Sequence, residues 1–125
     1  VNGGARVSGG TDMRKLCELI CHRYGLNCYT SNSPTELVKH LNRGGVAIAN
    51  CSGKGMFSTG GHYVTVLGVL GGKLCIADSG LYTGKYSTAA RRAKVQVSGD
   101  LIFADAATLD ADCVGRYPRY YLFSK

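Results

Sequence analysis

The stretch HYVTVLGVLGGKLCIAD, residues 62–78, is the part of the sequence that most restricts the fold of this chain. Residues 62–70 are dominated by aliphatic, β-branched and aromatic side chains, which favour a β-strand. Gly71 and Gly72 follow, and a Gly-Gly pair readily adopts the positive φ angles of a two-residue hairpin turn. Residues 73–77 then predict the returning strand, so the stretch predicts an antiparallel β-hairpin.

Two helices are predicted ahead of this hairpin. Gly25 is placed as the C-terminal cap of the first, whose apolar side chains share one face at positions 13, 16, 17, 20 and 24. Ser33 and Glu36 frame the start of the second, with serine at the N-cap and glutamate three residues later, as in a capping box. Proline at the first helical position supports the same start.

The rest of the chain predicts further strands and a single domain. Strands are expected at 26–30, 46–49, 94–97, 101–104 and 120–124, and a helical turn at 108–113. Residues 1–10 are rich in glycine and predict a flexible lead-in. Residues 11–125 then predict one α+β domain, with two N-terminal helices packed on a mainly antiparallel sheet.

The charge balance narrows the classes of partner. The chain has 15 Lys and Arg against 8 Asp and Glu, a net charge of +7. Such a surface suits an anionic cell wall, an anionic membrane or nucleic acid. Nucleic-acid-binding proteins usually also contain a recognition motif, or aromatic side chains interleaved with basic ones. In this chain, only residues 116–121 loosely show such interleaving. Nucleic acid is therefore not favoured, and Arg91-Arg92 is interpreted as a solvated face. No apolar run approaches the ~20 residues of a membrane span.

Three polar residues, Cys51, His62 and Asp78, fall at the ends of predicted strands. If the strands that carry Cys51 and His62 pair, both residues lie at the same end of the sheet. A histidine acts as a general base when a carboxylate fixes its tautomer and stabilises the imidazolium, and Asp78 supplies that residue type. The alternatives are a histidine bonded to a loop carbonyl and an aspartate that caps its own backbone turn.

Asp78 reaches His62 only if the hairpin is irregular. A regular two-residue turn pairs Thr65 with Asp78, and alternation of side chains then puts Asp78 on the face opposite His62. One extra residue in a β-bulge corrects this. We therefore predict a bulge, centred on Gly72.

The remaining chemistry-bearing residues give weaker signals. The six cysteines are at positions 17, 21, 28, 51, 75 and 113, and Cys17-x-x-x-Cys21 without a second ligand pair is a poor zinc signature. No metal or cofactor site is therefore predicted, and most cysteines are expected to be packing residues. His22 and His40 are expected to be exposed on their helices.

The chain resembles the double-glycine (bacteriocin-processing) cysteine peptidase-like family of the papain-like clan. Tyr24-Gly25-Leu26 is similar to the helix end of that family, and Gly60-Gly61-His62-Tyr63 to the strand that carries its histidine. Ala77-Asp78-Ser79 stands where Asn-Asp-Pro is usual. The resemblance covers residues 10–80 and, loosely, the last ten residues.

The resemblance implies a papain-like fold and a thiol peptidase or amidase that needs no cofactor. His62 would be the general base and Asp78 the orienting acid, with a peptide or peptidoglycan-like substrate. The family's nucleophilic cysteine opens a helix ahead of the matched segment, and nothing in residues 1–10 matches it. The nucleophile is therefore expected upstream of Val1, or absent. An extracellular or cell-wall-associated location is also implied.

Three alternatives stay open. Cys51, in Asn50-Cys51-Ser52-Gly53, superficially resembles the nucleophile of NlpC-type cell-wall peptidases, although it ends a strand and lacks a helix dipole that would lower its pKa. A catalytically dead pseudopeptidase would bind peptide or glycan in the same cleft. A basic surface-binding module, with His62 incidental, is the third.

Overall fold

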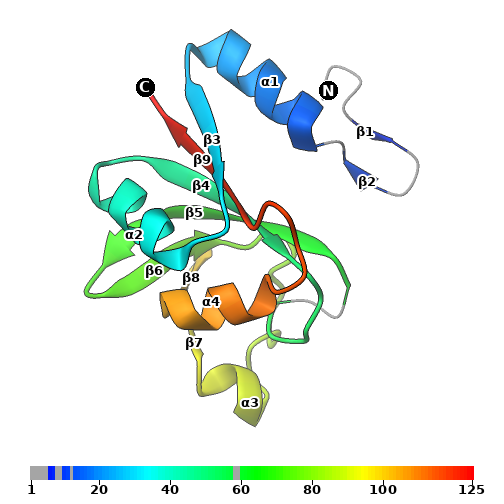
Figure 1. Cartoon of the computed structure of the whole chain (residues 1–125). Helices are drawn as coiled ribbons and strands as arrows, with labels where there is room; N and C mark the ends of the chain where they lie inside the picture. Colours follow the sequence, from blue (N-terminus) through cyan, green and yellow to red (C-terminus); the bar gives the residue numbers. More distant parts are fainter. Residues whose placement is uncertain (1–5, 8–9, 12, 58–59) are drawn as a thin grey trace.

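The computed structural model describes residues 6–7, 10–11, 13–57 and 60–125 and has an α+β fold (Figure 1). The described helices are α1 (Met13–Tyr24), α2 (Pro34–Asn42), α3 (Ala89–Arg92) and α4 (Ala106–Asp112). The sheet strands are β3 (Asn27–Ser31), β4 (Val46–Cys51), β5 (His62–Leu70), β6 (Lys73–Ala77), β7 (Val95–Ser98), β8 (Leu101–Ala104) and β9 (Tyr120–Ser124). Within the described residues, no helix is long and apolar enough to cross a membrane.

The seven strands form one antiparallel sheet in the order β3-β9-β4-β5-β6-β8-β7. The C-terminal strand β9 lies between β3 and β4, so the end of the chain forms the second strand from the β3 edge of the sheet. The glycine-rich lead-in is less irregular than predicted, because β1 (Arg6–Val7) pairs with β2 (Gly10–Thr11). Residues 1–5 and 8–9 of the lead-in lie outside the described residues.

The helices cover both faces of the sheet. α1 packs its Met13 and Cys17 side chains against Phe123, with Ile48 and Tyr121 beside them. α2 and α4 cover the other face, where the largest cluster of buried side chains lies. The prediction of two N-terminal helices on the sheet is thus confirmed for the helices themselves, but they lie on opposite faces and two further helices, α3 and α4, accompany them (Figure 1).

The predicted helix ends are largely confirmed. α1 ends at Tyr24, and Gly25 follows with φ 64°, the left-handed conformation that glycine adopts without strain. The Ser33 hydroxyl accepts a hydrogen bond from the Glu36 amide at 3.2 Å, as in a capping box. The Ser33 amide, however, donates to the Ser31 hydroxyl.

His40 is buried, which corrects the expectation that it is exposed. Its Nε2 lies 2.8 Å from the carbonyl oxygen of Phe123 and 3.1 Å from that of Val46, so the ring ties α2 to β9 and β4. The imidazole packs on Gly45, where a Cβ atom would lie 2.2 Å from Nε2. A satisfied structural role therefore accounts for His40.

The hairpin of β5 and β6 contains the predicted irregularity at a different place. Leu70 pairs with Lys73, and Gly71 and Gly72 form the turn with φ 60° and 79°. The register shifts between Val66 and Gly68, so the extra residue is Leu67, and a bulge centred on Gly72 is wrong. Both positions of the turn require positive φ, so Gly72 is part of the turn and not of the bulge.

Candidate functional site

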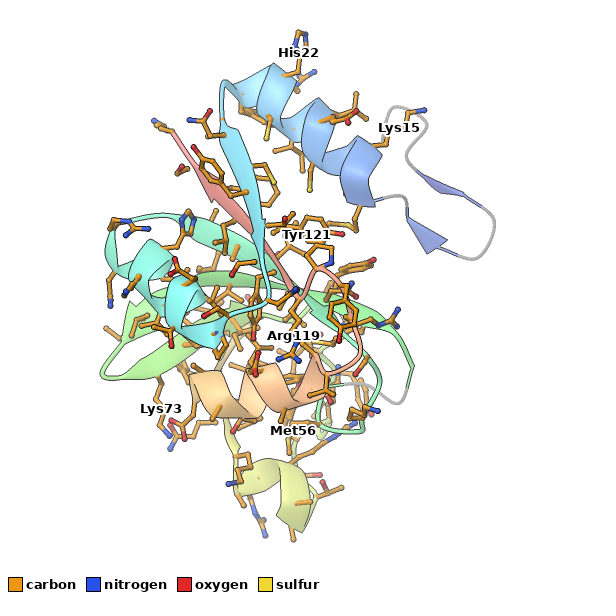
Figure 2. The ribbon with its side chains drawn as sticks, in the orientation of Figure 1. Lys15, His22, Met56, Lys73, Arg119 and Tyr121 are labelled. Carbon is orange, nitrogen blue, oxygen red and sulfur yellow. The ribbon has the colours of Figure 1, made fainter. Side chains whose placement is uncertain are left out.

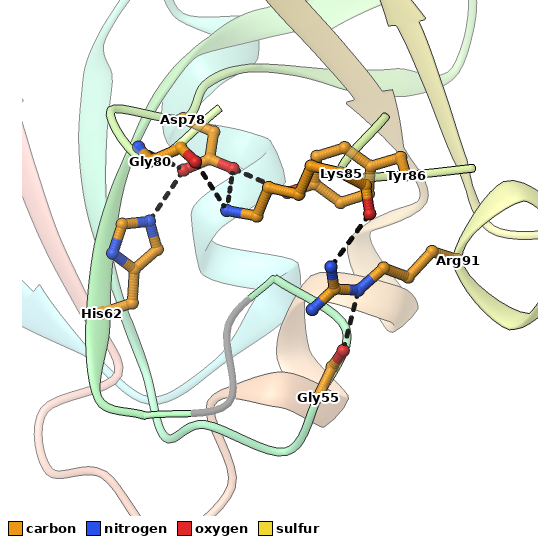
Figure 3. Close-up of polar contacts among 7 residues, drawn as sticks. All are labelled: Gly55, His62, Asp78, Gly80, Lys85, Tyr86 and Arg91. Carbon is orange, nitrogen blue, oxygen red and sulfur yellow. Dashed lines mark hydrogen bonds and ion pairs between the residues drawn. The ribbon is translucent and has the colours of Figure 1, made fainter. Parts of the chain in front are cut away.

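His62 and Asp78 meet at one end of the sheet. His62 is the first residue of β5, and Asp78 directly follows β6. Because Thr65 pairs with Ala77, Asp78 falls opposite Val64, which shares a face with His62. The His62 Nε2 atom lies 2.7 Å from Oδ1 of Asp78 (Figure 3). The bulge thus brings Asp78 to the same face of the sheet as His62, which was the reason for predicting it.

The contact assigns different roles to the two ring nitrogens of His62. An ionised carboxylate can only accept a hydrogen bond, so Nε2 of the neutral ring carries the proton and donates it to Asp78. Nδ1 is then the nitrogen with a free lone pair. The His62 side chain is 19% exposed, so the ring that carries Nδ1 is partly accessible to solvent.

The Asp78 side chain is fully buried and surrounded by hydrogen-bond donors. Oδ1 accepts from His62 and from the amide of Gly80, at 2.7 and 2.9 Å. Oδ2 accepts from the Lys85 ammonium at 2.6 Å and from the Tyr86 hydroxyl at 2.7 Å (Figure 3). Four donors, one of them the Lys85 cation, therefore compensate the burial of this carboxylate.

The predicted alternative role of Asp78 is present at the same time. Asp78-Ser79-Gly80 forms a turn in which the carboxylate accepts from the Gly80 amide, two residues on. A Cβ atom at Gly80 would lie 3.2 Å from the His62 ring and 3.3 Å from the Lys85 ammonium, so glycine allows both to approach. The turn fixes the carboxylate that His62 contacts.

The surroundings keep Asp78 ionised. Burial alone would raise the pKa of the Asp78 carboxyl, but the hydrogen bonds from Lys85, His62, Tyr86 and the Gly80 amide outweigh it and lower the pKa from 3.8 to about 2. The carboxylate therefore stays charged throughout the pH range in which a histidine titrates.

The lowered pKa predicts a loss of stability in acid. A depressed carboxyl pKa stabilises the fold above pH 3.8, and this contribution is lost as the pH falls through about 2. The shift corresponds to about 2 kcal/mol of unfolding free energy. Urea unfolding at intervals from pH 5 to pH 2 measures it, and Asp78→Asn is expected to lack this part of the slope. Equal slopes in the two proteins would contradict the assignment.

Cys51 lies on the same face as His62 but is fully buried. The two residues pair directly across β4 and β5. The Cys51 side chain is inaccessible, and contact with the Cys113 thiol, burial and the nearby Asp112 raise its pKa. A thiol in this setting stays protonated, so Cys51 lacks the properties of a nucleophile in this conformation.

The other cysteines do not meet His62 in an accessible position. Cys113 is fully buried. Cys75 alternates with the buried Leu74 and Ile76 on β6 and so points to the opposite face of the sheet from His62. On that opposite face, three cysteines line one cavity of about 380 Å³ between α1 and β3: Cys17 and Cys21 of α1 and Cys28 of β3. Burial raises the pKa of Cys17 to about 12.

Sequence reasoning missed Lys85 and Tyr86. Both are buried, although they belong to a segment between β6 and α3 that has no hydrophobic periodicity. Their side chains become part of the site because the segment folds back over Asp78, a long-range placement that local patterns do not encode. The only available signal was a lysine and a tyrosine soon after a candidate acid.

Among the described residues, no group of three or more His, Cys, Asp or Glu side chains is arranged to hold a metal ion. His62 donates to Asp78, and Lys85 and Tyr86 donate to the other oxygen of the same carboxylate. Comparison of the chain with protein-family models, with curated proteins and with solved structures gave no match.

Proposed function

We propose that this chain belongs to a papain-like thiol peptidase or amidase domain, in which it supplies the general base, His62, and the orienting acid, Asp78. The observation that carries the proposal is the 2.7 Å contact between Nε2 of the partly exposed His62 and the buried carboxylate of Asp78. A histidine oriented in this way by an ionised carboxylate is the arrangement that activates a nucleophile in acyl transfer.

The reaction would use the two nitrogens of His62 separately. Nδ1 would accept the proton of a cysteine thiol, and the thiolate would attack the carbonyl carbon of an amide. The resulting imidazolium would give the same proton to the departing amine, which leaves an acyl-enzyme thioester. Asp78 would stabilise the imidazolium through Nε2. Water, deprotonated by the same nitrogen, would then attack the thioester carbonyl; the C–S bond would break to release the acid, and the imidazolium would return its proton to the thiolate.

The thiol would come from outside these 125 residues. The buried and remote positions of the cysteines support this part of the proposal, since only Cys51 and Cys113 share the face of His62 and both are inaccessible. We place the nucleophile on a segment that precedes Val1, as the family resemblance implies. The net charge of +7 favours an anionic substrate, such as a cell-wall peptide.

The test uses the protein with its encoded residues preceding Val1. The purified protein is incubated with short peptides of glycine and alanine and with cell-wall cross-link peptides, and newly formed amines are measured. Cleavage that iodoacetamide abolishes, with the label mapped to a cysteine before Val1, is expected. Label on Cys51 together with loss of activity would contradict the placement of the nucleophile, and absence of cleavage would contradict the enzymatic proposal.

A pseudopeptidase is the second candidate, because none of the six cysteines is accessible on the face of His62. In that case the same site would bind peptide without turnover. Saturable binding of the test peptides, unaffected by alkylation and without release of amine, would favour this second function.

A further inference from the structure

Arg91 is not part of a solvated face, in contrast to the prediction for Arg91-Arg92. Its Nε donates to the carbonyl oxygen of Gly55 at 3.0 Å, and its NH1 donates to the carbonyl oxygen of Lys85 at 2.9 Å. The guanidinium also lies 5.7 Å from the centre of the Tyr86 ring. One side chain therefore joins two segments that are far apart in the sequence (Figure 3).

Arg91 is connected to Asp78 through Lys85 and Tyr86. It binds the backbone of Lys85 and packs on the ring of Tyr86, and the side chains of these two residues donate to Oδ2 of Asp78. The Tyr86 ring is also held by an edge contact with the fully buried Phe57. The guanidinium thus contacts both residues that fix this carboxylate oxygen.

On the other side, Arg91 leads to the segment that precedes His62. Gly55 lies two residues after Gly53, which packs directly on Gly60, since a Cβ atom at Gly53 would lie 2.8 Å from the Gly60 carbonyl carbon. Gly60 is two residues before His62. The Arg91 guanidinium therefore contacts Gly55, whose neighbour Gly53 packs on a residue near His62 in the sequence, and Lys85 and Tyr86, which donate to Asp78.

We infer that Arg91 is a positioning residue that sets the hydrogen bond between His62 and Asp78 by clamping the backbones at Gly55 and Lys85. The planar guanidinium suits this role because it donates in two fixed directions at once, whereas the lysine ammonium is a compact point donor. The short helix α3 presents the side chain, and its N-cap Thr88 accepts from the Arg91 amide at 3.4 Å. This role rests on the proposed function, since it concerns the same pair.

The test measures the pair itself and needs no catalysis. Exchange of the His62 Nε2 proton with water is followed by NMR in the native chain and in Arg91→Gln, Arg91→Lys and Arg92→Gln. Loss of both hydrogen bonds in Arg91→Gln is expected to raise the exchange rate about tenfold or more, and Arg91→Lys is expected to rescue part of this effect. Arg92 is the matched control because it is exposed on the same helix. Urea unfolding of each variant is measured in parallel.

The outcomes separate positioning from general stabilisation. Faster exchange in Arg91→Gln, partial rescue by Arg91→Lys and no change in Arg92→Gln would support the inference. An unchanged exchange rate in a folded Arg91→Gln chain would overturn it, whatever the change in stability. If Arg91→Gln does not fold, Arg91→Lys tests the inference instead. An exchange rate of the His62 Nε2 proton in Arg91→Lys equal to that of the native chain would contradict a clamp made of two hydrogen bonds. The exchange rate can be measured even in a chain that hydrolyses no peptide. Failure of the proposed function can therefore be distinguished from failure of the inference about Arg91.

Discussion

Replacement of Lys85 by methionine is expected to lower the free energy of unfolding at pH 7 by about 3–5 kcal/mol. Lys85 is 6% exposed and lies 2.6 Å from a carboxylate that is fully buried. Removal of the cation leaves the charge of Asp78 without its closest compensation in a site where water cannot replace it. The prediction is measured by urea unfolding of the native chain and of Lys85→Met.

Two further variants show whether the buried pair is responsible. In Asp78→Asn/Lys85→Met both charges are absent, so much of the lost stability is expected to return. Lys73→Met removes the cation of an exposed pair, Lys73–Asp105, in which the side chains are 42% and 56% accessible. The loss there is expected to be at most about 1 kcal/mol. Equal losses in Lys85→Met and Lys73→Met would contradict the described role of Lys85.

Replacement of His62 by alanine is expected to reduce kcat/KM for peptide hydrolysis by about a thousandfold or more in the protein with its encoded upstream residues. In the proposed reaction, the variant would lack both the proton acceptor and the imidazolium that protonates the leaving amine. Steady-state kinetics on the best peptide from the cleavage assay measure the loss.

His22→Ala provides the matched control for this variant. His22 is exposed and projects away from the sheet at the far end of α1 (Figure 2). Its removal is expected to leave kcat/KM unchanged. Activity that survives His62→Ala would show that another group acts as the base.

The sequence predicted the elements with strong local signals. The α2 start is encoded by Ser33-Pro34, and the β5–β6 turn by the Gly71-Gly72 pair. Asp78 was predicted to reach His62 because side-chain alternation required an irregular hairpin, and such an irregularity is present. Its position was wrong, because the number of residues per strand does not say where along the strand the extra residue lies.

Long-range features escaped prediction. The insertion of β9 between β3 and β4 depends on pairing between residues far apart in the sequence, such as Cys28 with Phe123 and Val46 with Phe123. α3 has only four residues and therefore gives no periodic signal. Lys85 is charged, and its burial follows from Asp78, which lies seven residues before it. Composition favours exposure for such a residue until its partner is known.

The tautomer of His62 is the property on which the proposed base depends. Nitrogen-15 NMR of the imidazole, at a pH where the ring is neutral, shows which ring nitrogen carries the proton. A protonated Nε2 that donates to Asp78, with an unprotonated Nδ1 that is available to a thiol, is expected. A protonated Nδ1 with an unprotonated Nε2 would contradict it, because the contact with Asp78 would lack its proton and the proposed base would be absent.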